Sequence, residues 1–266
     1  MTYPSSLQSV WIIGASSGIG EALAYAYAKR GEHLVLSARN REALATVAAR
    51  ARGAASICIE PLDVTDTNEI SLLAQRLCSS NHPVGTLIYT AGVSQRSRVQ
   101  DTNLAVYKRF IDVNYLGAVM ATLCILPHML KQHAGKLVII SSIVGKFGTP
   151  LRSGYSASKH ALRGFFESLR AEVFDFGIRI TLVYPGYIST SISMHSLTGD
   201  GTEYGKIDSA IANGIPVDQC AEQIIRAIDS DRHEIVIAGL RERLALLVSW
   251  LSPRLFSWII RNTSSV

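Results

Sequence analysis

Tyr155 and Lys159 lie four residues apart in a stretch with a helical pattern, and their side chains suggest proton-transfer chemistry. Positions i and i+4 share one face of a helix, about 5 to 6 Å apart at Cβ. At an effective dielectric of about 20, an ammonium beside a phenol lowers the pKa of the tyrosine by about three units, toward neutral pH. The pair therefore predicts a general acid–base group.

Two further polar residues are candidates for the same site. Ser142 ends the apolar run 136–142, which is typical of a buried parallel strand whose carboxyl end opens into a crevice. Asn114 lies among apolar neighbours in a long helical pattern, where a polar side chain needs a hydrogen-bonding partner. Because Tyr-x-x-x-Lys alone is more often a packed tyrosine beside a solvated lysine, the prediction depends on these companions.

A glycine-rich turn near the start of the chain predicts a dinucleotide site. Gly14 permits a tight exit from the preceding strand, Gly18 lets the backbone approach a pyrophosphate, and Gly20 lets the next helix pack on the sheet. The amides at the start of that helix face the anion. The same spacing also occurs in ordinary loops, and the strand–helix setting favours the binding function.

Strand and helix patterns alternate along the chain, which is typical of a doubly wound parallel α/β sheet. The expected strands are 10–14, 33–38, 56–60, 86–90, 136–141, 178–184 and 234–237. The expected helices are 18–30, 41–52, 67–79, 103–132, 154–176 and 217–229. Right-handed crossovers predict the order 3-2-1-4-5-6-7 of a Rossmann-type sheet of seven strands with helices on both faces, and a crevice at the carboxyl ends of the first and fourth strands.

With these motifs in this order, residues 10–239 resemble the short-chain dehydrogenase/reductase family, in its single-domain branch. The resemblance implies an oxidoreductase that acts on CH–OH donors with NAD(P) as acceptor. The catalytic tetrad that it implies is Asn114, Ser142, Tyr155 and Lys159. The cofactor contacts that it implies are Gly14, Ser16, Ser17, Gly18, Ile19, Gly20, Asp63, Val64, Ala91, Gly92, Asn114, Tyr155, Lys159, Pro185, Gly186, Ile188 and Thr190.

Two positions depart from the family pattern. Ile13 stands where a threonine is usual, and the familiar Asn-Ala-Gly element reads Thr90-Ala91-Gly92. In the family these side chains brace the loops, so the departures affect local rigidity more than chemistry. The Thr90 hydroxyl is expected to substitute in part.

The end of the second strand favours NADP(H) over NAD(H). Ala38 occupies the position at which an acidic residue would bind both ribose hydroxyls of NAD and repel a 2′-phosphate. Arg39 follows with a guanidinium suited to phosphate, and Ser37 could add a hydroxyl. The alternative is a solvated Arg39, since Ser17 is neutral where some NADP-binding relatives carry a second base.

The expected function is the interconversion of a carbonyl and a secondary alcohol by hydride transfer. Tyr155 would protonate the developing alkoxide, and Ser142 would hydrogen-bond the carbonyl oxygen. Lys159 would hold the nicotinamide ribose, and Asn114 would support a water that connects the lysine to solvent. The alternatives are a 3-oxoacyl thioester reductase, for which no distinctive surface for an acidic carrier is visible, and a non-catalytic NADP(H)-sensing regulatory protein, against which the complete tetrad argues.

Three segments of the sequence are expected to form the substrate pocket. Residues 1–239 are expected to form one catalytic domain with a mobile lid at about 187–215, and segments 94–99 and 144–148 would complete the pocket. An apolar substrate is favoured by the larger side chains of these regions, Phe147, Leu151, Tyr187 and Met194.

Residues 240–266 form a C-terminal apolar and basic extension, expected as two short helices broken at Pro253. Its apolar stripes are Leu244, Leu247, Val248 and Leu251, then Leu255, Trp258 and Ile259. The extension is too short and interrupted to span a bilayer. It is either an interfacial membrane anchor or a clamp packed on the core, the lid or another subunit, and we favour packing.

Composition limits the partners. The 266 residues are 48% hydrophobic and suffice for one large core, and the net charge of +5 comes from scattered residues, which argues against nucleic acid. The four cysteines and seven histidines show no metal-ligand spacing, so we expect reduced thiols and no metal. Residues 1–8 lack a secretion signal, which favours a cytoplasmic location, with membrane association through the extension as the variant. The family resemblance implies a small-molecule substrate and a homodimer or homotetramer formed through helices 103–132 and 154–176.

Overall fold

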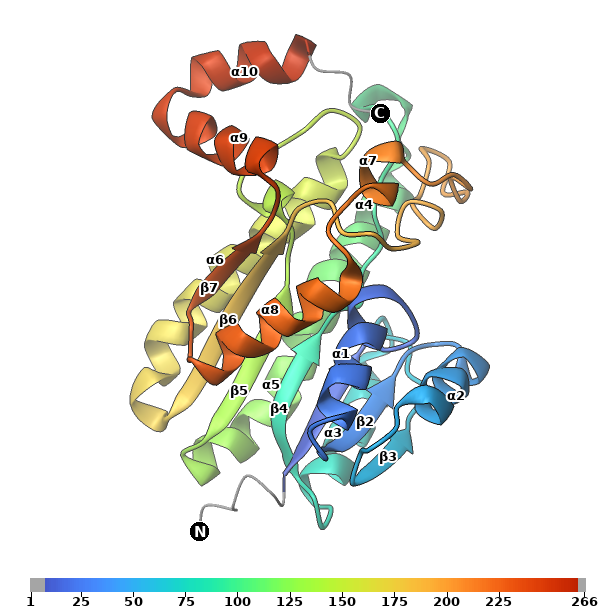
Figure 1. Cartoon of the computed structure of the whole chain (residues 1–266), viewed down its shortest axis with the longest axis vertical. Helices are drawn as coiled ribbons and strands as arrows, with labels where there is room; N and C mark the ends of the chain where they lie inside the picture. The colour runs from blue at the N-terminus through green and yellow to red at the C-terminus, as the bar shows by residue number, and fades with distance from the viewer. Residues whose placement is uncertain (1–7, 263–266) are drawn as a thin grey trace.

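A seven-stranded parallel sheet runs through the structure, a computed structural model that describes residues 8–262 (Figure 1). Its strands are β1 Ser9–Ile13, β2 His33–Ser37, β3 Ser56–Ile59, β4 Val84–Tyr89, β5 Gly135–Ile140, β6 Ile178–Pro185 and β7 Glu234–Ile237. All neighbouring pairs are parallel, in the order β3-β2-β1-β4-β5-β6-β7. The predicted fold class and strand order are confirmed. The expectations for residues 1–7 and 263–266 lie outside the described residues.

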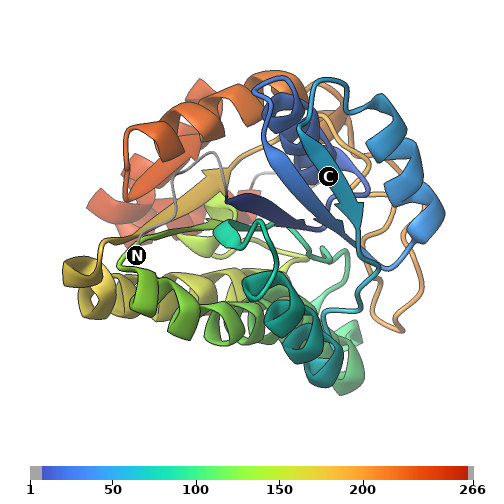
Figure 2. The same cartoon turned by 90° about the horizontal axis from the view of Figure 1, so that it is seen from below.

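Helices cover both faces of the sheet, and each face has its own hydrophobic core (Figure 2). On one face lie α1 Gly18–Ala28, α2 Arg41–Arg50 and α8 Val217–Asp229. On the other lie α3 Thr67–Cys78, α4 Leu104–Ile111, α5 Gly117–Gln132 and α6 Ser153–Val173. Alternate residues of β1 point to opposite faces, so that Trp11 joins one core and Ile12 the other. This two-sided burial explains why the strands are apolar throughout.

The helical run Leu104–Gln132 is long and apolar enough, by length and composition alone, to cross a membrane. In the structure Ala118, Ala121, Ile125 and Met129 of this run are fully buried in the core of the sheet. Packing on the sheet therefore accounts for the apolar character of this face of the run.

Two segments after β6 lie outside the sheet and the helices that cover it. Between β6 and α8 a long loop contains the short helix α7 Ser209–Ala212. After β7, the helices α9 Leu240–Leu251 and α10 Pro253–Asn262 project beyond the carboxyl ends of the strands (Figure 1). The two helices separated at Pro253 agree with the prediction from sequence. The four cysteines are free, as expected.

Candidate active site

Four of the predicted site residues lie where four adjacent strands of the sheet end. Gly14 follows β1, Ala91 follows β4, Ser142 follows β5, and Pro185 ends β6. Because the strands are parallel, these strand ends meet at one edge of the sheet. The structure therefore brings together segments that are far apart in the sequence.

The glycine turn is packed too tightly for any side chain at two of its positions. Gly14 has a φ of +92°, and a Cβ on it would lie 2.5 Å from the backbone nitrogen of Ala91. A Cβ on Gly20 would lie 2.6 Å from the Thr90 hydroxyl and would collide with the carbonyl of Gly14. These glycines permit close contact between β1, the start of α1 and the loop after β4.

Thr90 braces this turn, as expected from the departure at that position. Its hydroxyl lies 2.9 Å from the carbonyl oxygen of Ile13 and 3.0 Å from that of Gly14. The backbone amides of Thr90 and Ala91 also donate to the Ile13 carbonyl. The turn is thus held against β4.

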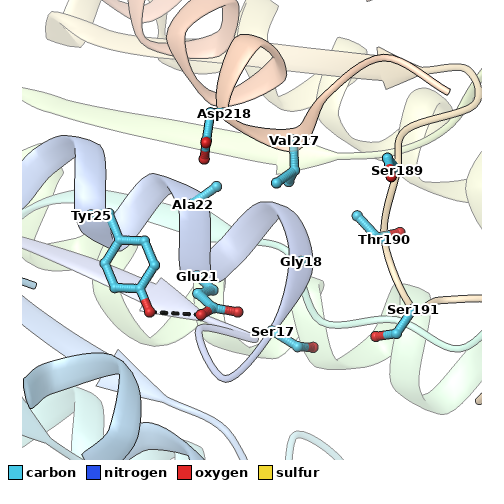
Figure 3. Close-up of a pocket in the computed structure, with 10 residues that line it drawn as sticks. All are labelled: Ser17, Gly18, Glu21, Ala22, Tyr25, Ser189, Thr190, Ser191, Val217 and Asp218. Atoms are coloured by element: carbon cyan, nitrogen blue, oxygen red, sulfur yellow. Dashed lines mark hydrogen bonds between the residues drawn. The ribbon is translucent and has the colours of Figure 1, made fainter. Parts of the chain in front are cut away.

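The start of α1 suits an anion. The side chain of Ser17, the N-cap residue, makes no hydrogen bond to the helix, so the first-turn amides have no side-chain cap. Thr190, from the loop after β6, lies against Gly18. A cavity of about 310 Å³ extends from these residues along the side of α1 (Figure 3).

Two acidic side chains also line this cavity. Glu21, which accepts a hydrogen bond of 2.6 Å from Tyr25, and Asp218 of α8 line it (Figure 3). Carboxylates repel phosphate, so Ser17, Gly18 and Thr190 are the lining residues suited to a pyrophosphate.

Arg39 and Asp63 lie near one another beyond the ends of β2 and β3. Burial alone would raise the pKa of Asp63, but hydrogen bonds from Thr65 and the charges of Arg39 and Arg109 lower it below its usual value. Arg39 is exposed and can reach a ligand. The suggestion that Ser37 adds a hydroxyl is wrong, because Ser37 is fully buried and accepts a hydrogen bond of 2.9 Å from the Trp11 indole.

Asn114 lies in a π-helical turn, Asp112–Leu116, which interrupts the single helix expected over residues 103–132. π-Helical turns of this kind often mark functional positions. The Asn114 carboxamide exchanges hydrogen bonds with the backbone of Val93, at 2.8 and 3.0 Å, and donates to the Ser158 hydroxyl at 2.9 Å. These bonds satisfy the buried amide and join α6 to the loop after β4.

Lys159 is buried beside the same loop. A Cβ on Gly92 would lie 3.4 Å from the Lys159 amine and 3.2 Å from the Asn114 side-chain oxygen, so these three residues are neighbours. The amine donates to the carbonyl of Ile140 at 2.9 Å. Burial lowers the pKa of Lys159 to about 7.

Tyr155 is 8% exposed, and its phenol has a pKa above the usual value. Burial raises this pKa, while a hydrogen bond with the Ser142 hydroxyl and the charges of Arg152 and Arg96 oppose the rise. The expectation that Lys159 brings the phenol near neutral pH is therefore not met, because burial has the larger effect on the Tyr155 pKa. The Lys159 amine lies over the ring, 5.7 Å from its centroid, and burial disfavours its charge.

The remaining predicted contacts include two core residues. Val64 belongs to the core on one face of the sheet, and Ile188 to the core on the other, with 8% and 5% exposure. Contact of their backbones with a ligand stays a prediction. In the part of the chain that the structure describes, no group of three or more metal-ligating side chains gathers.

Gln95 was missed by the sequence reasoning. Its side chain is fully buried, and its carbonyl oxygen accepts hydrogen bonds from the backbone amides of Gly154, at 2.7 Å, and Tyr155, at 3.2 Å. Gln95 therefore fixes the start of α6, and with it the position of Tyr155. No spacing in the sequence links residues 59 positions apart.

A buried ion pair between Arg96 and Asp208 was also missed. The Arg96 guanidinium donates to the Asp208 carboxylate from two nitrogens, one of them at 2.9 Å, and both side chains are at most 5% exposed. Arg152 lies 3.7 Å from the same carboxylate. The pair joins the loop after β4 to the segment before α7.

Comparisons with known proteins agree with this arrangement. A family model described as "short chain dehydrogenase" matches residues 8–200. The chain is 39% identical over 259 residues to "Dehydrogenase/reductase SDR family protein 7-like" from Anopheles gambiae, covering 95% of this chain and 82% of that protein. It is 38% identical to "Dehydrogenase/reductase SDR family member 7" from Homo sapiens, covering 94% and 74%.

Solved structures show the same fold. A short-chain dehydrogenase from Streptomyces avermitilis matches with a TM-score of 0.78 and 27% identity, over 94% of this chain and 97% of that one. A short-chain dehydrogenase from Sphingobium yanoikuyae in complex with NADPH matches with a TM-score of 0.78 and 24% identity, over 98% of both chains.

Proposed function

Because this chain belongs to the short-chain dehydrogenase family, we propose that it interconverts a carbonyl and a secondary alcohol with NADP(H), using Tyr155 as the acid–base group. The observation that carries the proposal is the grouping of Tyr155, Ser142 and Lys159 at the carboxyl edge of the sheet, beside the glycine turn. The oxidoreductase class follows from the family. The cofactor preference, the substrate and the residue roles are our proposal.

The phenol of Tyr155 is the proton donor when a carbonyl is reduced. Its raised pKa keeps the proton on the oxygen at neutral pH, so the group is ready to act as an acid. Ser142, whose hydroxyl already bonds the phenol, stabilises charge on the substrate oxygen. The phenolate left behind is stabilised by the nearby charges of Arg152 and Arg96. The bound nicotinamide supplies or accepts the hydride.

Lys159 supports the phenolate when an anion is bound nearby. Its pKa of about 7 reflects burial. Negative charge near the amine favours the ammonium form, because opposite charges stabilise each other. Lys159 thus gains its charge when the site is loaded, and Asn114 holds the adjoining loop through Val93 and Ser158.

Two observations support NADP(H) rather than NAD(H). Arg39 is exposed next to Asp63, at the position where a planar guanidinium suits a 2′-phosphate. Similar solved structures are named as complexes with 5-hydroxy-NADP, NADPH and NADP.

An apolar substrate fits the surroundings of Tyr155. Its ring packs with Ile143, Val144 and Ala238, and Phe147 lies against this cluster. We further propose that residues 1–239 form the catalytic domain in the cytoplasm, with 187–215 as the substrate lid. Exposed leucines on the π-helical turn and α5, Leu116 and Leu123, support self-association into a dimer or tetramer.

Tyr155→Phe tests the acid–base role. We expect turnover of an active carbonyl, found with a panel followed at the nicotinamide absorbance, to fall by about 100- to 10,000-fold. NADPH affinity should change little, because the variant removes only one hydroxyl.

Tyr27→Phe is the matched control. Tyr27 is a buried tyrosine on α1, and its hydroxyl accepts or donates no hydrogen bond found among the described residues. Turnover should survive this change. Retained turnover in Tyr155→Phe would reject the proposed role of Tyr155. If the parent protein acted on no carbonyl or alcohol of the panel, a sensing function would be favoured instead.

A further inference from the structure

The outward face of α9 is an unpartnered apolar stripe. Leu240, Leu244, Leu247 and Leu251 recur at the spacing of one helix face. Each is at least 49% exposed, and Trp250 beside them is 79% exposed. Such a stripe is unusual on a free surface and marks a contact region.

The helix α10 extends this surface. Arg254, Trp258 and Arg261 share one side of the helix because they are spaced i, i+4 and i+7. Trp258 is 59% exposed and Leu255 is 48% exposed. Tryptophan and arginine on one side of a helix are typical of segments at the boundary of lipid and water.

The opposite faces of α9 and α10 pack on the substrate side of the protein. Leu246 lies against the cluster of Tyr155, and Phe256 meets the ring of Phe147 edge-on at 4.9 Å. Glu242 accepts a hydrogen bond of 3.4 Å from the backbone amide of Tyr187. Packing of the extension was therefore a correct expectation for its inner face, and it leaves the outer face uncovered.

The charge of this extension is one-sided. Residues 240–262 contain Arg241, Arg243, Arg254 and Arg261 but a single acidic residue, Glu242. Glu242 is turned inward, and none of the four arginines forms an ion pair within the described residues 8–262. Arg243 donates hydrogen bonds to the carbonyls of Ala238 and Val236, so the other three arginines supply the positive charge of the apolar outer surface.

We propose that the outer face of α9 and α10 docks on the surface of an anionic phospholipid bilayer. Exposed leucine and tryptophan side chains would enter the boundary of headgroups and acyl chains, and the arginines would contact lipid phosphates. A second copy of this chain fits the surface less well, because it would bring two cationic faces with no outward acid against each other.

Docking in this way has a consequence for the substrate. The helices that touch lipid on one side touch Phe147 and the Tyr155 cluster on the other. Substrate dissolved in the bilayer would then reach the pocket without crossing water. This consequence rests on the proposed function, and it makes a lipid-soluble carbonyl the substrate class.

Vesicle binding of the full chain tests the docking surface without any turnover. We expect the protein to sediment with vesicles of phosphatidylcholine and phosphatidylserine and much less with phosphatidylcholine alone. Replacing two arginines, R254Q together with R261Q, should weaken binding to the anionic vesicles by about 30-fold, since each basic residue near such a surface contributes about 1 kcal/mol. W250S together with W258S should weaken binding to both.

A matched control removes two exposed positive charges elsewhere, R52Q together with K131Q. It should bind anionic vesicles like the parent protein. Equal loss in this control, or no preference for anionic vesicles, would overturn the proposal. A parent dimer that dissociates in W250S/W258S, with no vesicle binding, would assign the surface to a second copy and also overturn it.

Activity separates the docking surface from the proposed chemistry. R254Q/R261Q should reduce a long-chain ketone in anionic vesicles more slowly than the parent does, and a short water-soluble ketone at the same rate. Equal rates on both would reject delivery from the bilayer. If the parent protein turns over neither compound, the proposed function fails while vesicle binding still decides the docking surface.

Discussion

The cofactor side and the substrate side of this protein are held together in different ways. On the cofactor side, Gly14 and Gly20 bring backbone against backbone, with no room for a methyl group. On the substrate side, Arg96 and Asp208 join segments 112 residues apart through their side chains. Backbone contacts tolerate no change of residue type, whereas side-chain contacts can be exchanged in pairs. A side chain at either glycine would therefore meet neighbouring atoms at once, whereas the Arg96–Asp208 contact depends on the two side chains themselves.

Asp208→Asn should have the largest effect, on the substrate side. Removing one partner of a buried ion pair leaves an unpaired charge, and we expect the free energy of unfolding to fall by about 3 to 5 kcal/mol. Both side chains are at most 5% exposed. Urea denaturation measures the loss.

The control for this change is Asp229→Asn. Asp229 pairs with Arg30, and the two side chains are 48% and 40% exposed. This pair therefore contributes about 1 kcal/mol or less to the free energy of unfolding. Similar losses in both variants would contradict the special role of the buried pair.

The variants Gly20→Ala and Gly148→Ala compare the two sides directly, because each adds one methyl group to a glycine. A Cβ at residue 20 meets Thr90 and Gly14, whereas a Cβ at residue 148 meets nothing within 4 Å. We expect the first to destabilise the cofactor turn by about 1 to 3 kcal/mol and weaken NADPH binding. The second should leave both unchanged. Thermal melting and NADPH fluorescence titration measure the two effects, and equal NADPH affinities would break the comparison.

Lys159→Met tests how the free energy of unfolding depends on pH at a residue that lies between the two sides. Because burial lowers the pKa of Lys159 to about 7, the unfolded chain binds more protons than the folded protein above that pH. The free energy of unfolding should therefore rise with pH between about 7 and 10.5, by about 2 kcal/mol from pH 7 to pH 9 in the parent relative to the variant. Urea denaturation at the two pH values gives this difference.

Lys29→Met, at an exposed lysine, serves as the control for this pH dependence. It should follow the parent protein at both pH values. A Lys159→Met variant that also follows the parent would show that the amine is charged in the folded state.

Arg39→Ala should have the smallest effect, confined to the cofactor. Loss of one charge-assisted contact to an exposed phosphate should weaken NADPH binding by about 10-fold and leave NADH binding unchanged. Arg41→Ala, at the neighbouring exposed arginine, is the control. Equal weakening of both cofactors would reject the selectivity of Arg39.

Much of the fold was predictable because it depends on short-range patterns. The seven strands appear within two residues of their expected bounds, since apolar runs bounded by turns reflect burial on both faces. The helix expected over 103–132 is interrupted by a π-helical turn at Asp112–Leu116, in which the Val113 carbonyl accepts a hydrogen bond from the Tyr89 hydroxyl and the Asn114 side chain bonds the Val93 backbone. Periodicity does not reveal such a turn.

The site was predictable in part for the same reason. The order of the glycine turn, Ser142, Tyr155 and Lys159 along the chain places them at one sheet edge once the sheet is parallel. The contribution of Gln95 was not predictable, because nothing near it in the sequence indicates that it will face the start of α6. The burial of Ser37 against the Trp11 indole was not predictable either, and this burial prevents the Ser37 hydroxyl from reaching a cofactor.

The amino-acid order alone was enough to predict the family and the strand order, because these depend on residue type and spacing. Folding in three dimensions decided the direction in which the pKa values of Tyr155 and Lys159 shift, the Arg96–Asp208 pair, and which face of α9 stays uncovered. The physical reason is that desolvation and ion pairing depend on distances between atoms that are remote in the chain. Those distances exist only after the sheet and its loops have assembled.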